Sequence, residues 1–174
     1  MAEILHVFTA VEKGKPVREV EESVVLENKG LEHCIHGRPE SRRQVLLMDI
    51  ETLEQFGVAP GRVKENLTTC GIVLRELAAG QRLRAGSALL EVTLACEPCR
   101  QMDMIRMGLR DVLRGRRGML CRVIRTGVVR RGDALEAVSA ENAELQSPPA
   151  SGRRACIGAE LNSYAKAFLG GEDE

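Results

Sequence analysis

Two cysteines three residues apart are the side chains of this sequence best suited to chemistry. Cys96 and Cys99 lie in the stretch LEVTLACEPCRQM, after an apolar run and before a cationic one. A thiol can act as a nucleophile, as a ligand for a soft metal ion or as half of a redox pair. Each of these uses needs different surroundings, so the neighbouring residues decide among them.

Zinc binding, redox exchange and simple burial are the alternatives for this pair. A structural zinc site takes about four ligands, usually as two paired sets, and the segment HCIH at residues 33–36 is not a standard second set. A thioredoxin-type couple opens a helix within a βαβ unit, whereas the flanking sequence is typical of antiparallel strands. Burial as a small apolar residue is the preferred interpretation for Cys70, Cys121 and Cys156.

Cys99 differs from the other cysteines in its flanking residues. Pro98 precedes it, and a predicted helix begins at Arg100. A helix N-terminus and a neighbouring cation both favour the thiolate form of a cysteine, which is the nucleophile and the soft-metal ligand. Cys99 is therefore the candidate catalytic residue.

The positive charge of the chain is concentrated around this pair. The whole sequence carries 25 basic and 25 acidic residues, but residues 96–131 hold ten arginines and three acidic residues. Arginine suits bidentate recognition of phosphate or carboxylate, so the segment indicates an anionic ligand. Nucleic acid is disfavoured as a partner, because the net charge is zero and aromatic residues, which stack on bases, make up 2% of the chain.

Length and hydropathy indicate a globular, cytoplasmic protein. The 174 residues suffice for one core, and no apolar run is long enough to span a membrane. The N-terminal MAEILHVFTA has no basic region of the kind that begins a signal peptide. In the cytoplasm, the six cysteines are expected to be thiols rather than a disulfide framework.

The elements that must position Cys99 are short strands separated by Gly and Pro turns. Two helices are expected, at Ile50–Phe56 and at Arg100–Leu113, the second because its apolar residues share one helical face. Val73–Leu77 is a further helical turn. The predicted strands are Ile4–Val11, Val17–Val20, Val24–Glu27, Gln44–Asp49, Ala88–Leu94, Leu120–Arg125 and Ala134–Val138.

We therefore predict a mainly β fold, a mostly antiparallel β-barrel with a few short flanking helices. Residues 1–140 form this domain. Residues 141–174 are a linker rich in Ser, Pro and Gly followed by a C-terminal tail, with a short helix expected at Cys156–Leu169.

Four segments resemble, in order, the MOSC domain, which is the C-terminal domain of molybdenum cofactor sulfurases and also occurs as a small stand-alone bacterial protein. They are KGLEHCIHGRPESRRQVLLMD (29–49), PGRVKENLTTCGI (60–72), LAAGQRLRAGSALLEVTLACEPCRQM (77–102) and GRRGMLCRVIRTGVVRRGDAL (115–135). The resemblance implies an antiparallel β-barrel, in agreement with the turn-rich pattern.

The resemblance also implies a sulfur carrier or a molybdenum cofactor-binding protein that acts in cofactor sulfuration. The family's cysteine follows a proline and corresponds to Cys99, as persulfide carrier or as molybdenum ligand, with Cys96 as a resolving thiol. A cysteine desulfurase that depends on pyridoxal phosphate would load it, and a molybdoenzyme or its cofactor would receive the sulfur. The sequence shows no pyridoxal phosphate site of its own.

Two other functions stay open at this stage. Some relatives hold a molybdenum cofactor and reduce N-hydroxylated compounds, so the resemblance also allows a molybdenum-dependent reductase. A non-catalytic module that binds anions is the third. The sequence does not decide whether the protein is an enzyme, with sulfurtransferase-like or cofactor-dependent activity.

Several polar residues are candidates for binding the cofactor. Arg43 precedes a strand and could hold an anion, while the run from Glu65 to Thr69 offers an amide and two hydroxyls to a pterin or a phosphate. A solvated charge and turn hydrogen bonds are the structural alternatives for these two. The candidates are His36, Arg43, Glu65, Asn66, Thr68, Thr69 and Arg100.

Three further features complete the prediction. Many family members read G-x-x-G-D-x-H where this chain has GLEHCIH, so His33 and Cys34 replace Gly and Asp while His36 is kept. Either replacement could take over a polar or soft-ligand role, and a loop residue without a function is the alternative for His33. The arginines at 114, 116 and 117 are expected to complement a helix dipole, and the methionines at 102, 104 and 107 to fill the core.

Overall fold

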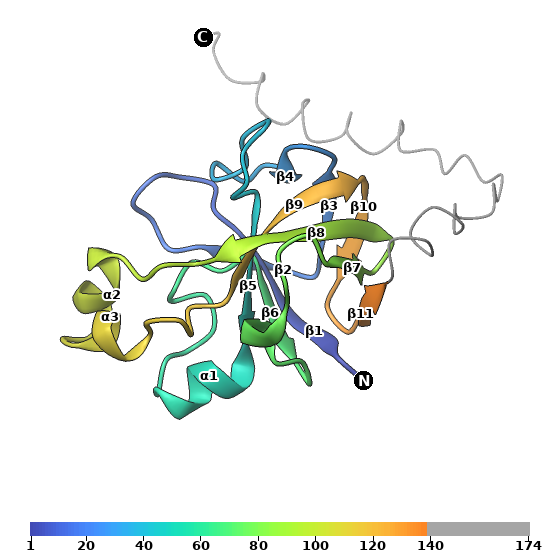
Figure 1. Cartoon of the computed structure of the whole chain (residues 1–174). Helices are drawn as coiled ribbons and strands as arrows, with labels where there is room; N and C mark the ends of the chain where they lie inside the picture. The colour runs from blue at the N-terminus through green and yellow to red at the C-terminus, as the bar shows by residue number, and fades with distance from the viewer. Residues whose placement is uncertain (139–174) are drawn as a thin grey trace, which may run out of the picture.

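The chain is built mainly of β-strands (Figure 1), in a computed structural model that describes residues 1–138. Eight strands form the larger sheet, in the order β11 (Leu135–Val138), β7 (Arg82–Ala85), β8 (Ala88–Ala95), β9 (Met119–Arg125), β5 (Val45–Asp49), β6 (Leu67–Cys70), β1 (Glu3–Thr9) and β2 (Arg18–Val20). Three strands form a smaller sheet, in the order β10 (Gly127–Arg130), β3 (Glu22–Leu26) and β4 (Gly30–Leu31).

The mainly β, mostly antiparallel prediction is confirmed for the described residues. Every named strand pair is antiparallel except β5 with β6. Closure into a barrel is not confirmed, because the larger sheet ends at β11 and β2. A single bridge between Glu3 and Ala134 links β1 to the residues before β11, and no continuous ladder joins them among the described residues.

The parallel pair is connected through α1 (Ile50–Gln55), because parallel strands need a crossover rather than a hairpin. The Asp49 carboxylate at the end of β5 accepts a hydrogen bond from the Thr52 N–H at 3.0 Å and caps this helix. The crossover returns the chain to the start of β6, where Asn66 lies.

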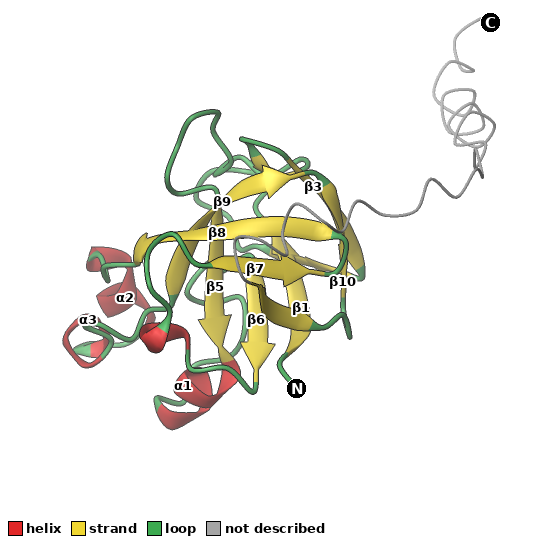
Figure 2. Ribbon diagram, turned by 45° about the vertical axis from the view of Figure 1, so that its right-hand side comes forward, coloured by secondary structure: helices red, strands yellow, loops and turns green. Residues whose placement is uncertain are grey.

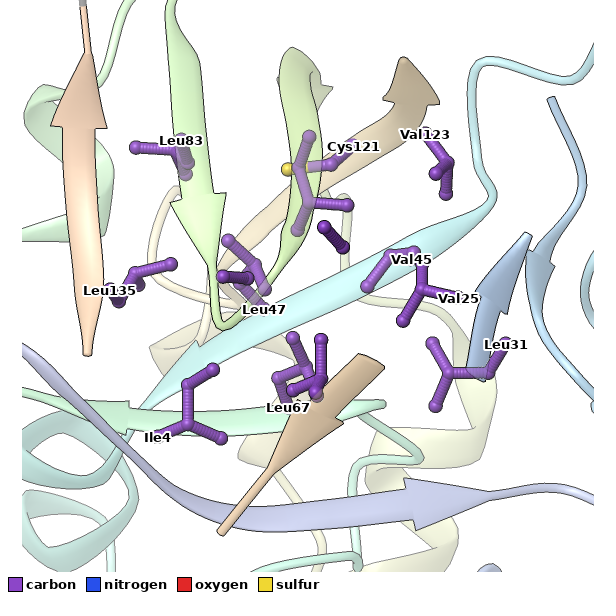
Figure 3. Close-up of a cluster of buried hydrophobic side chains, with 14 of the residues drawn as sticks. Ile4, Val25, Leu31, Val45, Leu47, Leu67, Leu83, Cys121, Val123 and Leu135 are labelled. Atoms are coloured by element: carbon purple, nitrogen blue, oxygen red, sulfur yellow. The ribbon is translucent and has the colours of Figure 1, made fainter. Parts of the chain in front are cut away.

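The main core lies between the two sheets, and β5 has buried side chains on both of its faces. Val45 and Leu47 point into this core, where Val25 and Leu31 of the smaller sheet meet them (Figure 3). The alternate residues Leu46 and Met48 belong to other clusters. Successive side chains of a strand point to opposite faces, so Leu46 and Met48 mark the outer face of the sheet.

The helices gather at one side of the strands (Figure 2), where they cover part of this outer face. The cluster beneath them includes Met48, Leu53, Met102 and Leu109, all buried. The prediction of one helix over Arg100–Leu113 is wrong. The chain forms α2 (Arg100–Ile105) and α3 (Leu109–Val112), because Arg106 is extended at φ −158° and Gly108 is left-handed at φ 79° between them.

Seven predicted strands and the helix at α1 are observed, and the expected helical turn is the 3₁₀ helix η1 (Leu74–Glu76). Four short strands were not predicted, namely β4, β6, β7 and β10. The predicted linker and terminal helix, like the last residues of the predicted first domain, lie outside the described residues.

Candidate functional site

A cavity of about 620 Å³ opens on the outer face of the larger sheet, next to the helices. Leu46 of β5 and Leu120 of β9 are paired across the strands and form its apolar floor together with Cys96. The cavity floor and the main core therefore lie on opposite faces of the same strands, because successive side chains of a strand point to opposite faces.

The side chains around this floor are strongly basic. Those that line the cavity are Lys13, Gly14, Ile35, His36, Arg38, Arg43, Leu46, Lys64, Asn66, Cys96, Gln101, Arg117 and Leu120. Five of them are Lys or Arg, and none of the described lining residues is acidic. Converging cations in a partly enclosed site attract anions, so the cavity suits an anionic ligand.

Arg117 contacts the sulfur of Cys96 directly. Its Nη1 donates to Sγ of Cys96 at 2.7 Å and to the carbonyl of Glu97 at 3.2 Å, and its Nη2 donates to the carbonyl of Val63 at 3.1 Å. The side chain is only 8% exposed, and its Nε has no hydrogen-bond partner among the described residues. A buried guanidinium with a donor left over is suited to one more acceptor from a ligand.

The backbone around Gly118 fixes the position of Arg117. Gly118 has φ 79°, and a Cβ on it would collide with the carbonyl oxygen of Leu47. Its own carbonyl accepts a hydrogen bond from the N–H of Cys96 at 3.0 Å. The turn that begins β9 therefore holds Arg117 against Cys96, and only glycine fits it without strain.

The thiol of Cys96 is buried, at 4% exposure. Burial raises its pKa, and the positive charges of Arg117 and Arg43 oppose that rise.

Cys99 is exposed and lies at the N-cap of α2, outside the cavity lining. The two cysteines are near enough for their charges to interact, since ionised Cys99 would raise the pKa of Cys96. Gln101, two residues further along, lines the cavity, whereas Arg100 is exposed and does not. Cys96 thus faces the ligand space and Cys99 faces the solvent beside it.

Asn66 ties the strands of the site together. Its Oδ1 accepts from the N–H of Leu46 at 3.0 Å, and its Nδ2 donates to the carbonyl of Phe8 at 3.3 Å and to Sγ of Cys34 at 3.5 Å. The side chain is 5% exposed. One buried amide therefore connects β5, β1 and the loop that contains Cys34.

Cys34 is buried beside the cavity, behind its lining residues Ile35, His36 and Asn66. Burial alone would raise the pKa of its thiol. Hydrogen bonds from the side chain and backbone of His36, from the backbone of Ala10 and from Asn66 outweigh that effect and lower the pKa to about 6. The surroundings of Cys34 therefore favour the thiolate form of its side chain.

Glu65, Thr68 and Thr69 lie inside the protein and do not line the cavity. Oε1 of Glu65 accepts from the N–H of Gly61 at 2.6 Å and from the hydroxyl of Thr68 at 3.0 Å. Burial raises the pKa of Glu65, and these hydrogen bonds oppose the rise. Thr69 donates to the carbonyl of Met48 at 3.4 Å. The three residues thus hold the chain in place at and just before β6. This is the structural role, by hydrogen bonds in a turn, that the sequence offered as the alternative to cofactor binding.

The cavity thus contains three of the predicted cofactor-binding residues, His36, Arg43 and Asn66. It does not contain Glu65, Thr68, Thr69, Arg100 or Cys99.

Sequence reasoning missed the cavity positions of Lys13, Arg38, Lys64 and Arg117. Arg117 was assigned to a helix dipole, and that assignment is wrong because its side chain is buried against Cys96. Lys64 directly precedes the polar run 65–69, and Arg38 follows His36 by two residues. This closeness in sequence to candidate binding residues was the signal that could have identified them.

The methionine prediction holds in part. Met102 is buried in the cluster below the helices, whereas Met104 and Met107 are 86% and 88% exposed, so the core assignment is wrong for these two. Met104 lies on the exposed side of α2, and Met107 lies in the turn between α2 and α3.

No three side chains of His, Cys, Asp or Glu in residues 1–138 are arranged to hold a metal ion. None of the helices in this part of the chain is long and apolar enough to cross a membrane.

Comparison with known proteins identifies the family. A model of the MOSC domain matches residues 35–136, more than half of the chain. No curated protein has a sequence that matches this one significantly. The fold is similar to that of YuaD from Bacillus subtilis, with a TM-score of 0.68 and 20% identity over 79% of this chain and 96% of that one.

Two YiiM proteins are similar as well. The one from Escherichia coli has a TM-score of 0.62 and 27% identity over 80% of this chain and 70% of its own. The one from Geobacillus stearothermophilus has the same TM-score and 20% identity over 80% and 76% of the two chains. With more than half of its length matched by the family model, this chain belongs to the MOSC domain family.

Proposed function

We propose that this MOSC protein carries sulfur for a molybdenum cofactor or holds that cofactor, with the basic cavity as the ligand site and Cys99 as the thiol that a partner loads. One observation carries the proposal: Sγ of Cys96 lies 2.7 Å from the Arg117 guanidinium in a cavity with five basic side chains. A soft nucleophile and a set of cations at one site match a ligand that is both anionic and thiophilic.

The residues of the cavity fit such a cofactor. Its volume of about 620 Å³ lies within the range of small-molecule sites, roughly 300–1,000 Å³. Lys13, Arg38 and Lys64 would hold the phosphate of the pterin, and the unpartnered Nε of Arg117 would meet another of its acceptors. When bound, the cofactor supplies a metal that takes up sulfur or transfers oxygen, and Cys96 is the thiol that faces it.

Cys99 is suited to a different task, because its side chain is exposed. A partner of the cysteine desulfurase type would present a persulfide to it. The Cys99 thiolate attacks the outer sulfur, a new S–S bond forms on Cys99, and the partner's own sulfur leaves as a thiolate with the electron pair of the broken S–S bond. The outer sulfur keeps its oxidation state, so this step needs no oxidant.

The test is intact-mass analysis after anaerobic incubation with a cysteine desulfurase and cysteine. Wild type should gain one sulfur atom, and Cys99→Ala should gain none. Cys70→Ala is the control, because it removes a half-buried thiol in another part of the sheet, and it should gain one sulfur atom like wild type. Equal labelling of wild type and Cys99→Ala would refute Cys99 as the carrier.

A further inference from the structure

The helix pair formed by α2 and α3 exposes apolar side chains next to Cys99. Met104 is 86% exposed, Met107 88% and Val112 46%. Met102, on the same helix as Met104, is buried in the cluster beneath. Single exposed apolar residues are ordinary on a protein surface, but three within residues 104–112 of one helix pair are a concentration that indicates an interaction site.

The two helices form one unit at the edge of the molecule. The carboxylate of Asp103 on α2 accepts a hydrogen bond from the N–H of Arg110 on α3 at 3.2 Å. The carbonyl of Gly108, which follows Met107, accepts one from the N–H of Val112 at 3.4 Å. Both helices lie on the opposite side of the strands from β10 (Figures 1 and 2). Their exposed side chains are therefore open to a partner.

This unit begins at the exposed thiol of Cys99. Cys99 is the N-cap of α2, and Met104 follows it by five residues, about 8 Å along a helix that rises about 1.5 Å per residue. Docked proteins cover about 800 Å² on each side, a patch roughly 30 Å wide. A protein whose own sulfur reaches Cys99 therefore extends over α2 and its exposed methionine.

The charge around the apolar side chains is mainly positive. Residues 100–116 hold five arginines and two aspartates. Arg100 is exposed and lies four residues before Met104, on the same face of α2. A protein with an apolar centre and an acidic rim complements such a surface. Asp111, exposed among the arginines, disfavours a uniformly anionic partner such as a membrane.

We infer that the surface formed by Arg100, Met104, Met107 and Val112, here called the α2–α3 surface, is the docking site of the protein that loads Cys99 with sulfur. That protein presents an apolar patch with an acidic rim beside its own persulfide. Flexible methionines suit this contact, because they adapt to the shape of a partner. The inference rests on the proposed function and deepens it, since it assigns the face through which the donor approaches.

The test compares two sulfur donors on the full chain under anaerobic conditions. One is a bacterial cysteine desulfurase that carries a persulfide, and the other is sodium tetrasulfide, which is too small to need a docking surface. Alkylation and peptide mapping follow the rate at which Cys99 gains sulfur. Met104→Ser combined with Met107→Ser should lower the rate constant with the desulfurase roughly tenfold or more. The rate constant with tetrasulfide and the melting temperature should stay as in wild type.

Two substitutions of Val112 form a matched pair that tests the acidic rim. Val112→Glu should lower the rate constant with the desulfurase, because it sets a negative charge against the rim, whereas Val112→Lys should lower it less or raise it. The difference between the two should shrink as salt is added, since salt screens exposed charges. Both variants should react with tetrasulfide at the same rate.

Equal desulfurase rates for wild type and the methionine variant would overturn the inference. An equal loss with both donors, or equal desulfurase rates for the two Val112 variants, would overturn it too. Association of wild type with phosphatidylglycerol vesicles that the methionine variant loses would assign the surface to a membrane instead. Failure of the proposed function looks different: the desulfurase then places no sulfur on Cys99 of wild type, and the docking site falls with it.

Discussion

Replacing Cys34 with serine should remove a pH-dependent part of the stability of this protein. Burial raises the pKa of the Cys34 thiol, but hydrogen bonds from His36, Ala10 and Asn66 together lower it from 9.0 to about 6. Between these values the folded protein holds a thiolate where the unfolded chain holds a thiol. The unfolded state then binds one more proton, so the free energy of unfolding rises with pH across this window.

The size of the effect follows from the two pKa values. A lowering from 9.0 to about 6 corresponds to about 4 kcal/mol, at 1.36 kcal/mol for each pKa unit. The contribution is fully present above pH 9, the unfolded value. It decreases by about 1.4 kcal/mol for each pH unit on acidification and is lost as the pH falls through about 6.

Urea unfolding at a series of pH values in this window, in the presence of a reductant, measures the effect. The difference in unfolding free energy between wild type and Cys34→Ser should widen by about 1.4 kcal/mol for each pH unit. Cys121→Ser is the matched control, because burial raises the pKa of Cys121 and keeps it protonated throughout, so its difference from wild type should be constant below pH 8. A constant difference for Cys34→Ser as well would refute the proposed ionisation of Cys34.

Three further substitutions test the framework of the site. Arg117→Met should lower the free energy of unfolding by about 1–3 kcal/mol, because the carbonyls of Glu97 and Val63 lose their donor, and it should slow alkylation of Cys96; Arg114→Met, at an exposed position, should do neither. Asn66→Ala should cost about 2–4 kcal/mol in urea unfolding, since it removes the hydrogen bonds to Leu46, Phe8 and Cys34. Gly118→Ala should lower the melting temperature more than Gly115→Ala, because both glycines have positive φ but only at Gly118 would a Cβ collide with backbone; equal effects would contradict this reason.

Much of the fold could be predicted because strong local signals coincide with the elements. Gly and Pro turns separate the seven predicted strands, and the short helix expected at Ile50–Phe56 follows its strand as α1. The missed strands are short. Arg82–Ala85 alternates charged and apolar residues over only four positions, and Gly30–Leu31 has two. Such segments become strands only because partners on neighbouring strands complete their hydrogen bonds, a long-range effect that sequence periodicity does not contain.

The break between α2 and α3 had a visible signal that the periodic pattern outweighed. Ile105, Leu109 and Leu113 have helical spacing, but Gly108 lies inside the run. A glycine in a helix interior costs about 1 kcal/mol relative to alanine, and here it adopts a conformation that no helix contains. The interior glycine was therefore a signal against one continuous helix, although the chain already leaves the helix at Arg106.

The candidate site was predictable in chemistry but not in geometry. The excess of arginine from residue 96 onward and the CxxC pair indicated a thiol beside an anion site, and His36, Arg43 and Asn66 line the cavity. Which cysteine faces that cavity depends on a turn at Gly118 more than fifteen residues away, so spacing alone did not assign it. The contact of Arg117 with Cys96 joins two segments that only the pairing of β8 with β9 brings together.

Equilibrium binding of molybdenum cofactor shows most directly whether the basic cavity is the ligand site. The cofactor, released anaerobically from a molybdoenzyme, is titrated into wild type, Arg43→Ala and Arg110→Ala. Arg43 lines the cavity, whereas Arg110 is exposed on α3 outside it. Loss of a charge-assisted hydrogen bond costs about 1.5–3 kcal/mol, so we expect saturable one-to-one binding that Arg43→Ala weakens roughly 10- to 150-fold and Arg110→Ala leaves unchanged. Absence of saturable binding, or equal loss in both variants, would contradict this expectation.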